Sequence, residues 1–377
     1  MTQGRLSEVA AVFLKLGTIG FGGPAAHIAL MEDEVVRRRQ WITRAAFLDL
    51  VGATNLIPGP NSTELAIHLG HRRAGLPGLV VAGAAFILPA FVIVCGVAWA
   101  YERAGTLPQV MTVFRGVTPV MLAIVAQALF GLARTAIRSR LLAAAALLAF
   151  VAAVARPLNE LTILFGVGLG VGLLQWARTQ PGADRVAGVV APGVLLQVAP
   201  AVPPVAFSTA SLFMVFLKPG ALLFGSGYVL LAFLRADLVE RLGWLTDAQL
   251  LDAIVVGQVT PGPVFTTATF IGYLLGGLKG AAIATAAIFL PAFVFVGLSA
   301  PLIPRLRRSP LAGAMLDGVN VASLALMAAV TVSLARATLT GIVPATTAVA
   351  SLVLLVRFRL SATLLIAVAA AVALLGA

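Results

Sequence analysis

The chain has 377 residues, of which 60% are hydrophobic and 11% are charged, and its mean hydropathy is +1.04. These values exclude an ordinary soluble domain, in which about a quarter of the residues are charged. The formal net charge is +12. Because no basic tract is interleaved with aromatic residues, we expect no nucleic-acid partner.

Long charge-free segments recur along the chain and predict an all-α polytopic membrane protein. Each is long enough to cross a hydrocarbon core of about 30 Å. Residues 1–10 lack the apolar core and cleavage site of a removable signal peptide, so we expect the first span to direct insertion. The charge-free segments are 74–101, 116–133, 161–177, 281–303, 318–335 and 360–377.

No metal or other cofactor is expected. Cys95 is the only cysteine, so neither an intrachain disulfide nor a multi-cysteine metal site can form. His27, His68 and His71 share no metal-ligand spacing with carboxylates, and we expect each to have a structural or surface role.

The second half of the chain repeats the first at a distance of 203 residues, and at 202 residues after one residue is dropped. Chance matching of apolar helices would not keep lysine, tryptophan, aspartate and proline in register. We therefore predict a first repeat (1–178), a proline-rich connector (179–207) and a second repeat (208–377). The equivalent residues include Lys15 and Lys218, Trp41 and Trp244, Asp49 and Asp252, Pro58-Gly59-Pro60 and Pro261-Gly262-Pro263, and Pro89 and Pro291.

Each repeat begins with a span, 8–31 or 208–233, that glycines interrupt. A polar turn follows, and then a helix that starts near Thr43 or Thr246. This helix ends at the Pro-Gly-Pro segment, and a short helix continues to about Leu69 or Tyr273. Since neither helix of this pair is comfortably long enough to span, we interpret the pair as re-entrant. Four further spans complete the repeat.

The loop charges predict that the two repeats insert with opposite orientations. Arginines of the first repeat gather in alternate loops, and in the second repeat this bias is reversed. By the positive-inside rule the reversed bias places the two repeats in opposite orientations. Opposite orientations require an odd number of membrane crossings per repeat, which five spans and a returning re-entrant pair satisfy. Two inverted repeats with broken helices are typical of secondary transporters. The alternative is a duplicated structural bundle with parallel halves.

The Pro-Gly-Pro segments predict an anion site. Proline cannot lie within a continuous helix but favours the first helical position, so a new helix should start at Pro60 and at Pro263. Helix N-termini attract anions, and nearby hydroxyl and amide groups suit an oxyanion, although some could serve only as helix caps. The candidate residues are Gly22, Gly23, Asn55, Pro58, Gly59, Pro60, Asn61, Ser62, Gly225, Ser226, Gly227, Gln258, Thr260, Pro261, Gly262, Pro263 and Thr266.

Three charged residues are further candidates. Lys15 and Lys218 lie in the first span of each repeat, where they could line a pathway or extend to the membrane surface. Glu64 has no carboxylate counterpart, because the equivalent residue is Thr267. It could titrate and couple transport to protons, or it could form an ion pair with a lysine or arginine.

The motifs resemble those of the chromate ion transporter family in its two-domain, long-chain form. The resemblance rests on Phe21-Gly22-Gly23-Pro24-Ala25-Ala26-His27, on Phe224-Gly225-Ser226-Gly227-Tyr228 and on the two Pro-Gly-Pro segments, and its blocks cover about 13–94 and 216–296. It implies export of chromate, a sulfate-like dianion, across the inner membrane, driven by the proton gradient. Family members often have glutamine where this chain has Asn55, which leaves the identity of the oxyanion open.

Two other functions compete with secondary transport. A membrane lipid-phosphate phosphatase would need arginines and paired glutamates beside the breaks, where this chain has only Glu64 before Arg72. A passive anion channel is harder to separate from a transporter. We expect an inorganic oxyanion and the lipid bilayer as partners and no enzymatic activity. A homodimer and the sidedness of the termini stay open.

Overall fold

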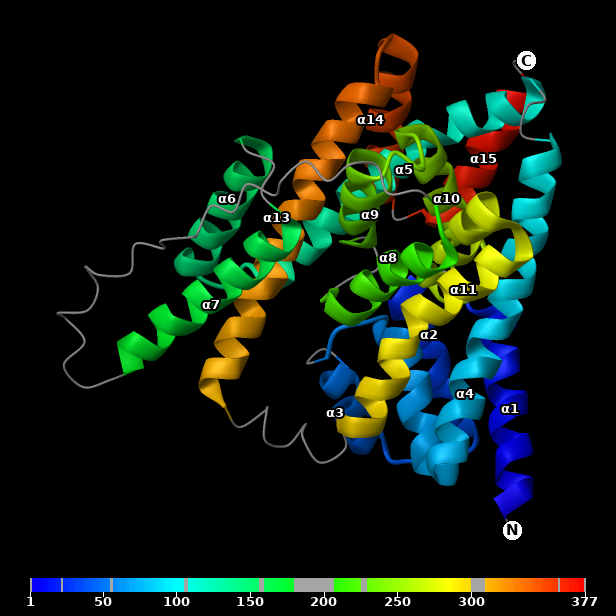
Figure 1. Ribbon diagram of the computed structural model, residues 1–377, viewed down its shortest axis with the longest axis vertical. Helices are drawn as coiled ribbons and strands as arrows, with labels where there is room; N and C mark the ends of the chain where they lie inside the picture. The colour runs from blue at the N-terminus through cyan, green and yellow to red at the C-terminus, as the bar shows by residue number, and fades with distance from the viewer. Residues whose placement is uncertain are drawn as a thin grey trace.

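The computed structural model describes residues 2–21, 23–54, 57–104, 108–155, 159–179, 207–224, 229–299, 309–358 and 360–375, and in these ranges the protein is helical with no strand (Figure 1). Residues 180–206, nearly all of the predicted connector, lie outside them. The division into repeats 1–178 and 208–377 therefore stays a prediction.

The first repeat contains seven helices and one π-helical turn in its described ranges. The predicted glycine interruption of the first span is confirmed, because α1 ends at Ile19 and α2 begins at Gly23. In order, the elements are α1 (Thr2–Ile19), α2 (Gly23–Glu32), η1 (Asp33–Arg38), α3 (Arg44–Thr54), α4 (Asn61–Ala104), α5 (Pro108–Ala136), α6 (Arg140–Ala155) and α7 (Glu160–Thr179).

The second repeat follows the same plan. Its α13, α14 and α15 begin 202 residues after α5, α6 and α7, so the structure extends the repeat beyond the residues that match in sequence. The elements are α8 (Thr209–Leu222), α9 (Leu230–Leu234), η4 (Arg235–Arg241), α10 (Asp247–Val259), η5 (Val264–Thr266), α11 (Thr267–Ser299), α13 (Pro310–Thr338), α14 (Ile342–Arg357) and α15 (Ala362–Leu375).

The helix that precedes each break starts where the sequence predicts. Thr43 Oγ1 accepts a hydrogen bond from the Ala46 N–H at 3.3 Å, and Thr246 Oγ1 accepts one from the Gln249 N–H at 3.2 Å. Each threonine therefore satisfies one of the free N–H groups of the first turn.

The helix after each break is longer than predicted. It does not end at Leu69 or Tyr273 but continues to a kink at Ala74-Gly75 in α4 and at Gly276-Gly277 in α11. Gly75 has φ +64° and Gly277 has φ +59°, a backbone conformation that ends a right-handed helix and favours glycine. Each kink separates a short first limb from a long second limb.

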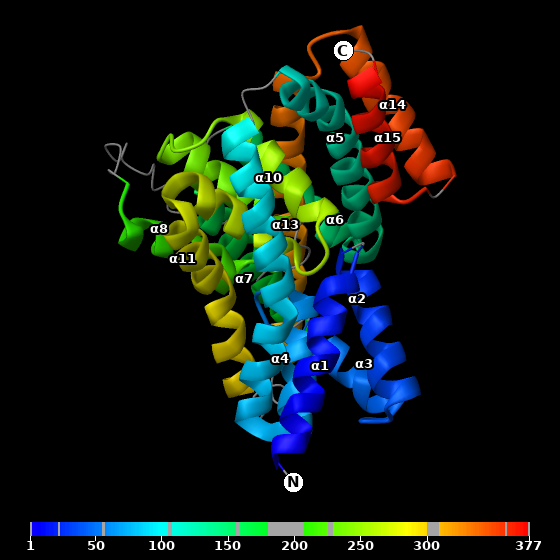
Figure 2. The ribbon, with the colours of Figure 1, turned by 90° about the vertical axis from the view of Figure 1, so that its right-hand side faces the viewer.

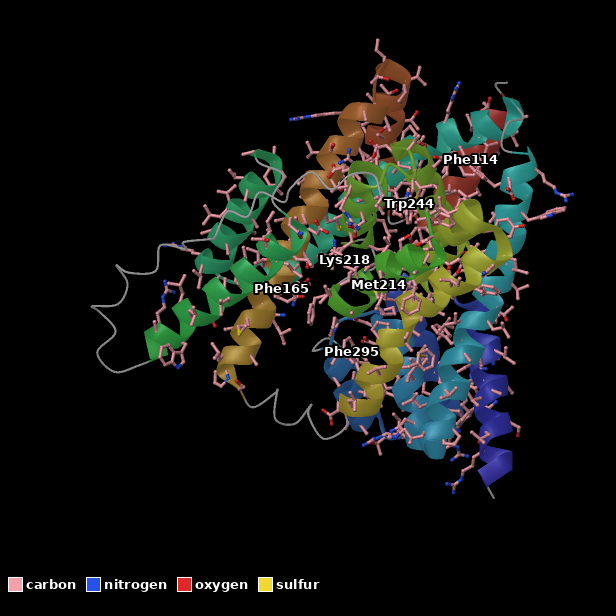
Figure 3. The ribbon with its side chains drawn as sticks, viewed as in Figure 1. Phe114, Phe165, Met214, Lys218, Trp244 and Phe295 are labelled. Atoms are coloured by element: carbon pink, nitrogen blue, oxygen red, sulfur yellow. The ribbon has the colours of Figure 1, made fainter. Side chains whose placement is uncertain are left out.

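Within the described ranges, five helices are long and apolar enough to cross a membrane: α4, α5, α7, α11 and α13. The remaining apolar helices are shorter, and the predicted span 360–377 yields the 14-residue helix α15. The outer surface carries large apolar side chains, among them Phe165 and Met214, which are 45% and 64% exposed (Figure 3). Extensive exposed apolar surface is expected where a protein contacts lipid.

The two repeats exchange helices. α6 and α7 of the first repeat pack on α13 of the second, and the equivalent α14 and α15 pack on α5 of the first. α4 and α11 also pack against each other, and so do α5 and α13. The repeats are therefore interlocked rather than separate domains.

The equivalent long limbs run in opposite directions. In Figures 1 and 2 the second limb of α4 leads away from the end of the molecule at which the N-terminus lies, whereas the second limb of α11 leads toward that end.

Candidate functional site

The Pro-Gly-Pro segment of each repeat binds the interrupted first span of the other repeat. The Gly59 N–H donates a hydrogen bond to the Leu223 carbonyl at 2.8 Å, and the Gly262 N–H donates one to the Gly20 carbonyl at 2.8 Å. Both donors and both acceptors are equivalent pairs at the distance of 203 residues. The two contacts are thus equivalent, and we call the two Pro-Gly-Pro segments together with these partners the crossing.

The crossing lies inside the protein. Gly59, Pro60 and the whole of Pro261-Gly262-Pro263 are buried. A Cβ atom on Gly262, whose φ is +93°, would lie 2.7 Å from the Cβ of Ala90 on the second limb of α4. Only glycine fits there, because any side chain would meet both an unfavourable φ and a neighbouring helix.

Two helices begin at the crossing. The N–H groups of Thr63 and Glu64 donate to the Pro60 carbonyl at 2.8 and 3.0 Å, and the Thr266 N–H donates to the Pro263 carbonyl at 3.0 Å. The predicted helix starts after the two breaks are therefore confirmed. The positive ends of both helix dipoles lie within the protein interior.

Two threonine hydroxyls among the candidates for oxyanion binding donate to backbone carbonyls. Thr260 Oγ1 donates to the Val256 carbonyl at 2.8 Å, and Thr266 Oγ1 donates to the Pro263 carbonyl at 2.7 Å. In this conformation they offer lone pairs rather than a donor. Thr63, another hydroxyl residue beside the first break, is fully buried, and its hydroxyl has no partner among the described residues.

Glu64 lies against the first break. Its side chain is completely buried, and neither carboxyl oxygen has a hydrogen-bond partner among the residues that the structure describes. A Cβ atom added to Gly59 would lie 2.4 Å from Glu64 Oε1, so the carboxyl group packs directly on the Pro-Gly-Pro glycine. An ion pair to lysine or arginine, the alternative that the sequence allowed, is absent within these ranges.

A small cavity lies beside the second break. It measures about 10 Å³, which is room for about one water molecule, and Gln258 and Thr267 are its polar lining residues. A tetrahedral oxyanion is larger than this cavity, so the neighbouring helices would have to move before an oxyanion could enter it. The apolar lining consists of Val125, Leu230, Leu231, Ile254 and Val264.

Lys15 and Lys218 form equivalent ion pairs. Lys15 Nζ is 2.8 Å from Glu34 Oε2, and Lys218 Nζ is 2.9 Å from Asp237 Oδ2. Lys218, labelled in Figure 3, also pairs with Glu160 of the first repeat. Glu34 and Asp237 are 203 residues apart, a match that sequence reasoning missed. A part for the lysines in anion binding stays a prediction.

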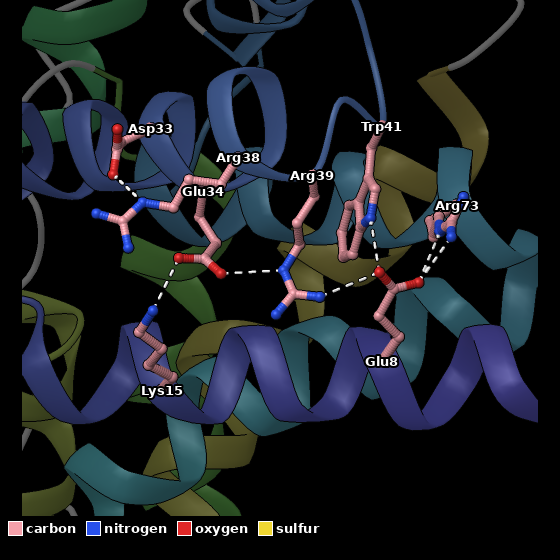
Figure 4. A network of polar contacts seen from close by, with 8 residues as sticks. All are labelled: Glu8, Lys15, Asp33, Glu34, Arg38, Arg39, Trp41 and Arg73. Atoms are coloured by element: carbon pink, nitrogen blue, oxygen red, sulfur yellow. Dashed lines mark hydrogen bonds and ion pairs between the residues drawn. The ribbon is translucent and has the colours of Figure 1, made fainter.

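The Lys15 pair belongs to a wider polar network (Figure 4). Arg39 joins Glu34 to Glu8, at 2.9 and 3.1 Å, and Glu8 also binds Arg73 at 2.7 Å. The Lys15 ammonium group holds the pKa of the Glu34 carboxyl below its usual value, and Arg39 adds to this effect. The network ties the end of the first limb of α4 to α1, on the side where the N-terminus lies.

The remaining candidates are placed as follows. His27 Nε2 lies 2.9 Å from the Gly20 carbonyl, which also accepts the bond from Gly262, as expected for a structural histidine. Pro58 and Asn61 are half-buried, Ser62 is buried, and Gly23 has φ +79° with open space at its Cβ position. Gly22, Asn55, Gly225, Ser226 and Gly227 lie outside the described residues.

Comparison with known proteins gives a consistent result across the chain. Residues 7–173 and 210–376 each match the family model described as chromate transporter. The chain is 34% identical to a chromate transport protein of Cupriavidus metallidurans, over 98% of this chain and 92% of the relative. It is 34% identical to a chromate transport protein of Pseudomonas aeruginosa, over 88% of this chain and 81% of the relative. A probable chromate transport protein of Synechococcus elongatus is 32% identical, over 89% and 86%. No solved structure matches the chain.

Proposed function

Because the chain belongs to the chromate transporter family, we propose that it is a secondary active transporter that exports chromate across the cytoplasmic membrane with coupling to protons. Members of this family are transport proteins rather than enzymes, which removes the lipid-phosphate phosphatase alternative. Sulfate, which has the same charge and shape, is the expected competitor.

The observation that carries the proposal is the reciprocal pair of hydrogen bonds at the crossing, from Gly59 to Leu223 and from Gly262 to Gly20. These bonds anchor both helix N-termini in the interior, each against the other repeat, where their partial positive charges favour an anion. Backbone donors suit a dianion that must be released again, because they bind it without a fixed cation. The oxyanion is held between the repeats, beside Pro60 and Pro263.

The two repeats are inserted with opposite orientation. The opposed directions of the long limbs of α4 and α11 support this arrangement, and the reversed arginine bias of the loops supports it independently. Inverted repeats allow the same binding place to open to either face by rocking one repeat against the other. The small cavity at Gln258 fits a conformation in which the binding place is closed.

Glu64 carries the coupling proton. Its carboxyl group is buried at the crossing without a charged partner among the described residues. An ionised carboxylate in such a place costs several kcal/mol in desolvation, and a proton removes that cost. The ionised carboxylate would also repel a dianion bound close by.

Flux into liposomes tests the proposal. Purified protein is reconstituted, and labelled chromate uptake is followed with and without an imposed pH gradient. We expect uptake above protein-free liposomes, competition by sulfate, weaker competition by molybdate and accumulation only with a gradient. The exposed helix variant Gly131→Ala, whose added Cβ meets nothing within 4 Å, serves as the unchanged control.

Two outcomes would contradict the proposal. If chromate enters no faster than in protein-free liposomes, the protein does not transport it. If flux follows the membrane voltage alone and ignores the pH gradient, the protein is a passive anion channel.

A further inference from the structure

Three titratable residues share one face of the first limb of α4. Glu64, His68 and His71 are spaced i, i+4 and i+7, which places their side chains in one row. Glu64 is completely buried, His68 is 5% exposed and His71 is half-buried. The row therefore leads from the crossing toward the surface, over about 10 Å at a rise of 1.5 Å per residue.

The two inner members of the row have unused polar atoms. Both carboxyl oxygens of Glu64 and the Nε2 atom of His68 are buried without a hydrogen-bond partner among the described residues. Buried polar side chains that serve only the fold are normally paired. Their helical spacing leaves about 5–6 Å between Cβ atoms, a gap that one water molecule can bridge.

Few charged groups of the elements packed around the first limb act on Glu64, His68 and His71. His71 and Arg72 are the charged or titratable groups that act on His68, and within the described residues none acts on Glu64. Arg5 of α1 and Lys279 of α11 are exposed, and other titratable groups on the packed helices have partners of their own. Lys15 of α1 binds Glu34, His27 of α2 binds the Gly20 carbonyl, Asp252 of α10 accepts from Tyr101, and Asp49 of α3 is also engaged.

The second repeat has no such row. Glu64 aligns with Thr267, and His68 and His71 align with Phe270 and Tyr273 at the distance of 202 residues that also relates the two kinks. None of these three residues exchanges a proton near neutral pH. The structural symmetry of the crossing is thus broken chemically. The row ends near Arg73, which Glu8 binds at 2.7 Å, so it reaches the side of the molecule where the N-terminus lies.

We propose that Glu64, His68 and His71 form a one-sided proton path that loads Glu64 from the N-terminal face. This inference rests on the proposed function and deepens it. His71 takes a proton from water and passes it to His68, and the His68 imidazolium gives its proton to the Glu64 carboxylate. Each histidine returns to its neutral form after the transfer.

The path determines what accompanies the oxyanion. Protonated Glu64 no longer repels a dianion and can donate a hydrogen bond to it. The proton and the oxyanion therefore occupy the protein together and move in the same direction. A dianion that leaves with one proton carries a net charge of −1, which an inside-negative membrane potential expels. On the far face the proton leaves into water that enters the opened site.

The test measures proton and chromate movement separately in liposomes that contain a pH-sensitive dye. One assay follows the pH change that accompanies net chromate flux, and the other follows exchange of labelled for unlabelled chromate at equal pH. Exchange does not require Glu64 to lose its proton between turnovers, so it does not depend on the path.

We expect His68→Gln to slow the proton movement about a hundredfold or more, in the range typical of a lost proton-transfer group, and to leave chromate exchange intact. Glu64→Gln should abolish the accompanying proton movement and make exchange independent of pH. His71→Gln should slow proton movement less, since water reaches this position. The matched variant Tyr273→Gln, at the position of the second repeat equivalent to His71, should slow neither.

The outcomes separate the two hypotheses. If His68→Gln lowers exchange and proton movement equally, His68 is structural and the path is refuted. Net chromate flux by the unaltered protein without any accompanying pH change would also refute the path while leaving chromate transport itself standing. No chromate movement at all would instead refute the proposed function.

Discussion

Substituting Gly262 by alanine tests whether the Pro-Gly-Pro segment of one repeat lies against the other repeat. Two costs combine. The residue has φ +93°, which costs a residue with a side chain about 1–2 kcal/mol. The new methyl group would lie 2.7 Å from the Ala90 Cβ, and overpacking of this kind costs about 1–3 kcal/mol. Together they lower the free energy of unfolding by about 2–5 kcal/mol.

Two matched variants separate these costs. Gly277 has φ +59° but open space at its Cβ position, so Gly277→Ala should show the backbone cost alone, about 1–2 kcal/mol. Gly131 lies in the exposed part of α5 with ordinary helical geometry and open space. Gly131→Ala should be neutral or stabilising, because alanine is the better helix former.

A second substitution checks the contact itself. Ala90→Gly removes the atom that the new methyl group would meet, so the double variant should recover the packing cost but not the backbone cost. Such a coupling between contacting residues is about 0.5–3 kcal/mol. Reversible unfolding by SDS in mixed micelles, followed by tryptophan fluorescence, measures the four single variants and the double variant. If Gly262→Ala costs no more than Gly277→Ala, or if Ala90→Gly recovers nothing, the crossing is not arranged as described.

The same titration checks three further expectations. Asp237→Asn should cost about 2 kcal/mol and Glu34→Gln about 1 kcal/mol, because the lysine partner of Asp237 is 21% exposed and that of Glu34 is 47% exposed; equal costs would contradict this reasoning. Lys15 lowers the pKa of Glu34 from 4.5, and a lowered folded-state pKa stabilises above the unfolded value. The unaltered protein should therefore have a higher free energy of unfolding than Glu34→Gln above pH 4.5, and this difference should disappear as the pH falls through the folded-state pKa of Glu34. Unfolding midpoints of both proteins at pH of about 3 and about 7 measure the difference. Tyr101→Phe removes the 2.8 Å hydrogen bond to buried Asp252 and should lower the free energy of unfolding by about 1–3 kcal/mol. A much smaller decrease would show that this hydrogen bond adds little to stability.

The sequence predicted the repeat and its breaks because rare residue types mark them. A lysine, a tryptophan and Pro-Gly-Pro kept in register over 203 residues identify equivalent positions, and proline dictates where a helix must stop. The same reasoning placed the helix starts at Thr43 and Thr246, where a capping side chain gives a local signal.

Contacts between distant helices could not be predicted in the same way. In lipid, apolar residues do not distinguish a face that packs on protein from one that packs on lipid, so α6 and α7 carry no mark of their partner α13. The carboxylates Glu34 and Asp237 were overlooked because two different residue types fill equivalent positions. Glu64 was recognised as a candidate, but its burial beside Gly59 is a property of the folded arrangement.

The exchange of helices between the repeats also sets the order of events during synthesis. α6 and α7 leave the ribosome long before α13 exists, so their apolar surfaces meet only lipid until the chain has been extended to Thr338. Neither half alone holds all the helices against which its own helices pack. Premature termination after the first repeat would leave α6 and α7 without the helix against which they pack. Their unpacked surfaces would mark the truncated chain for membrane quality control.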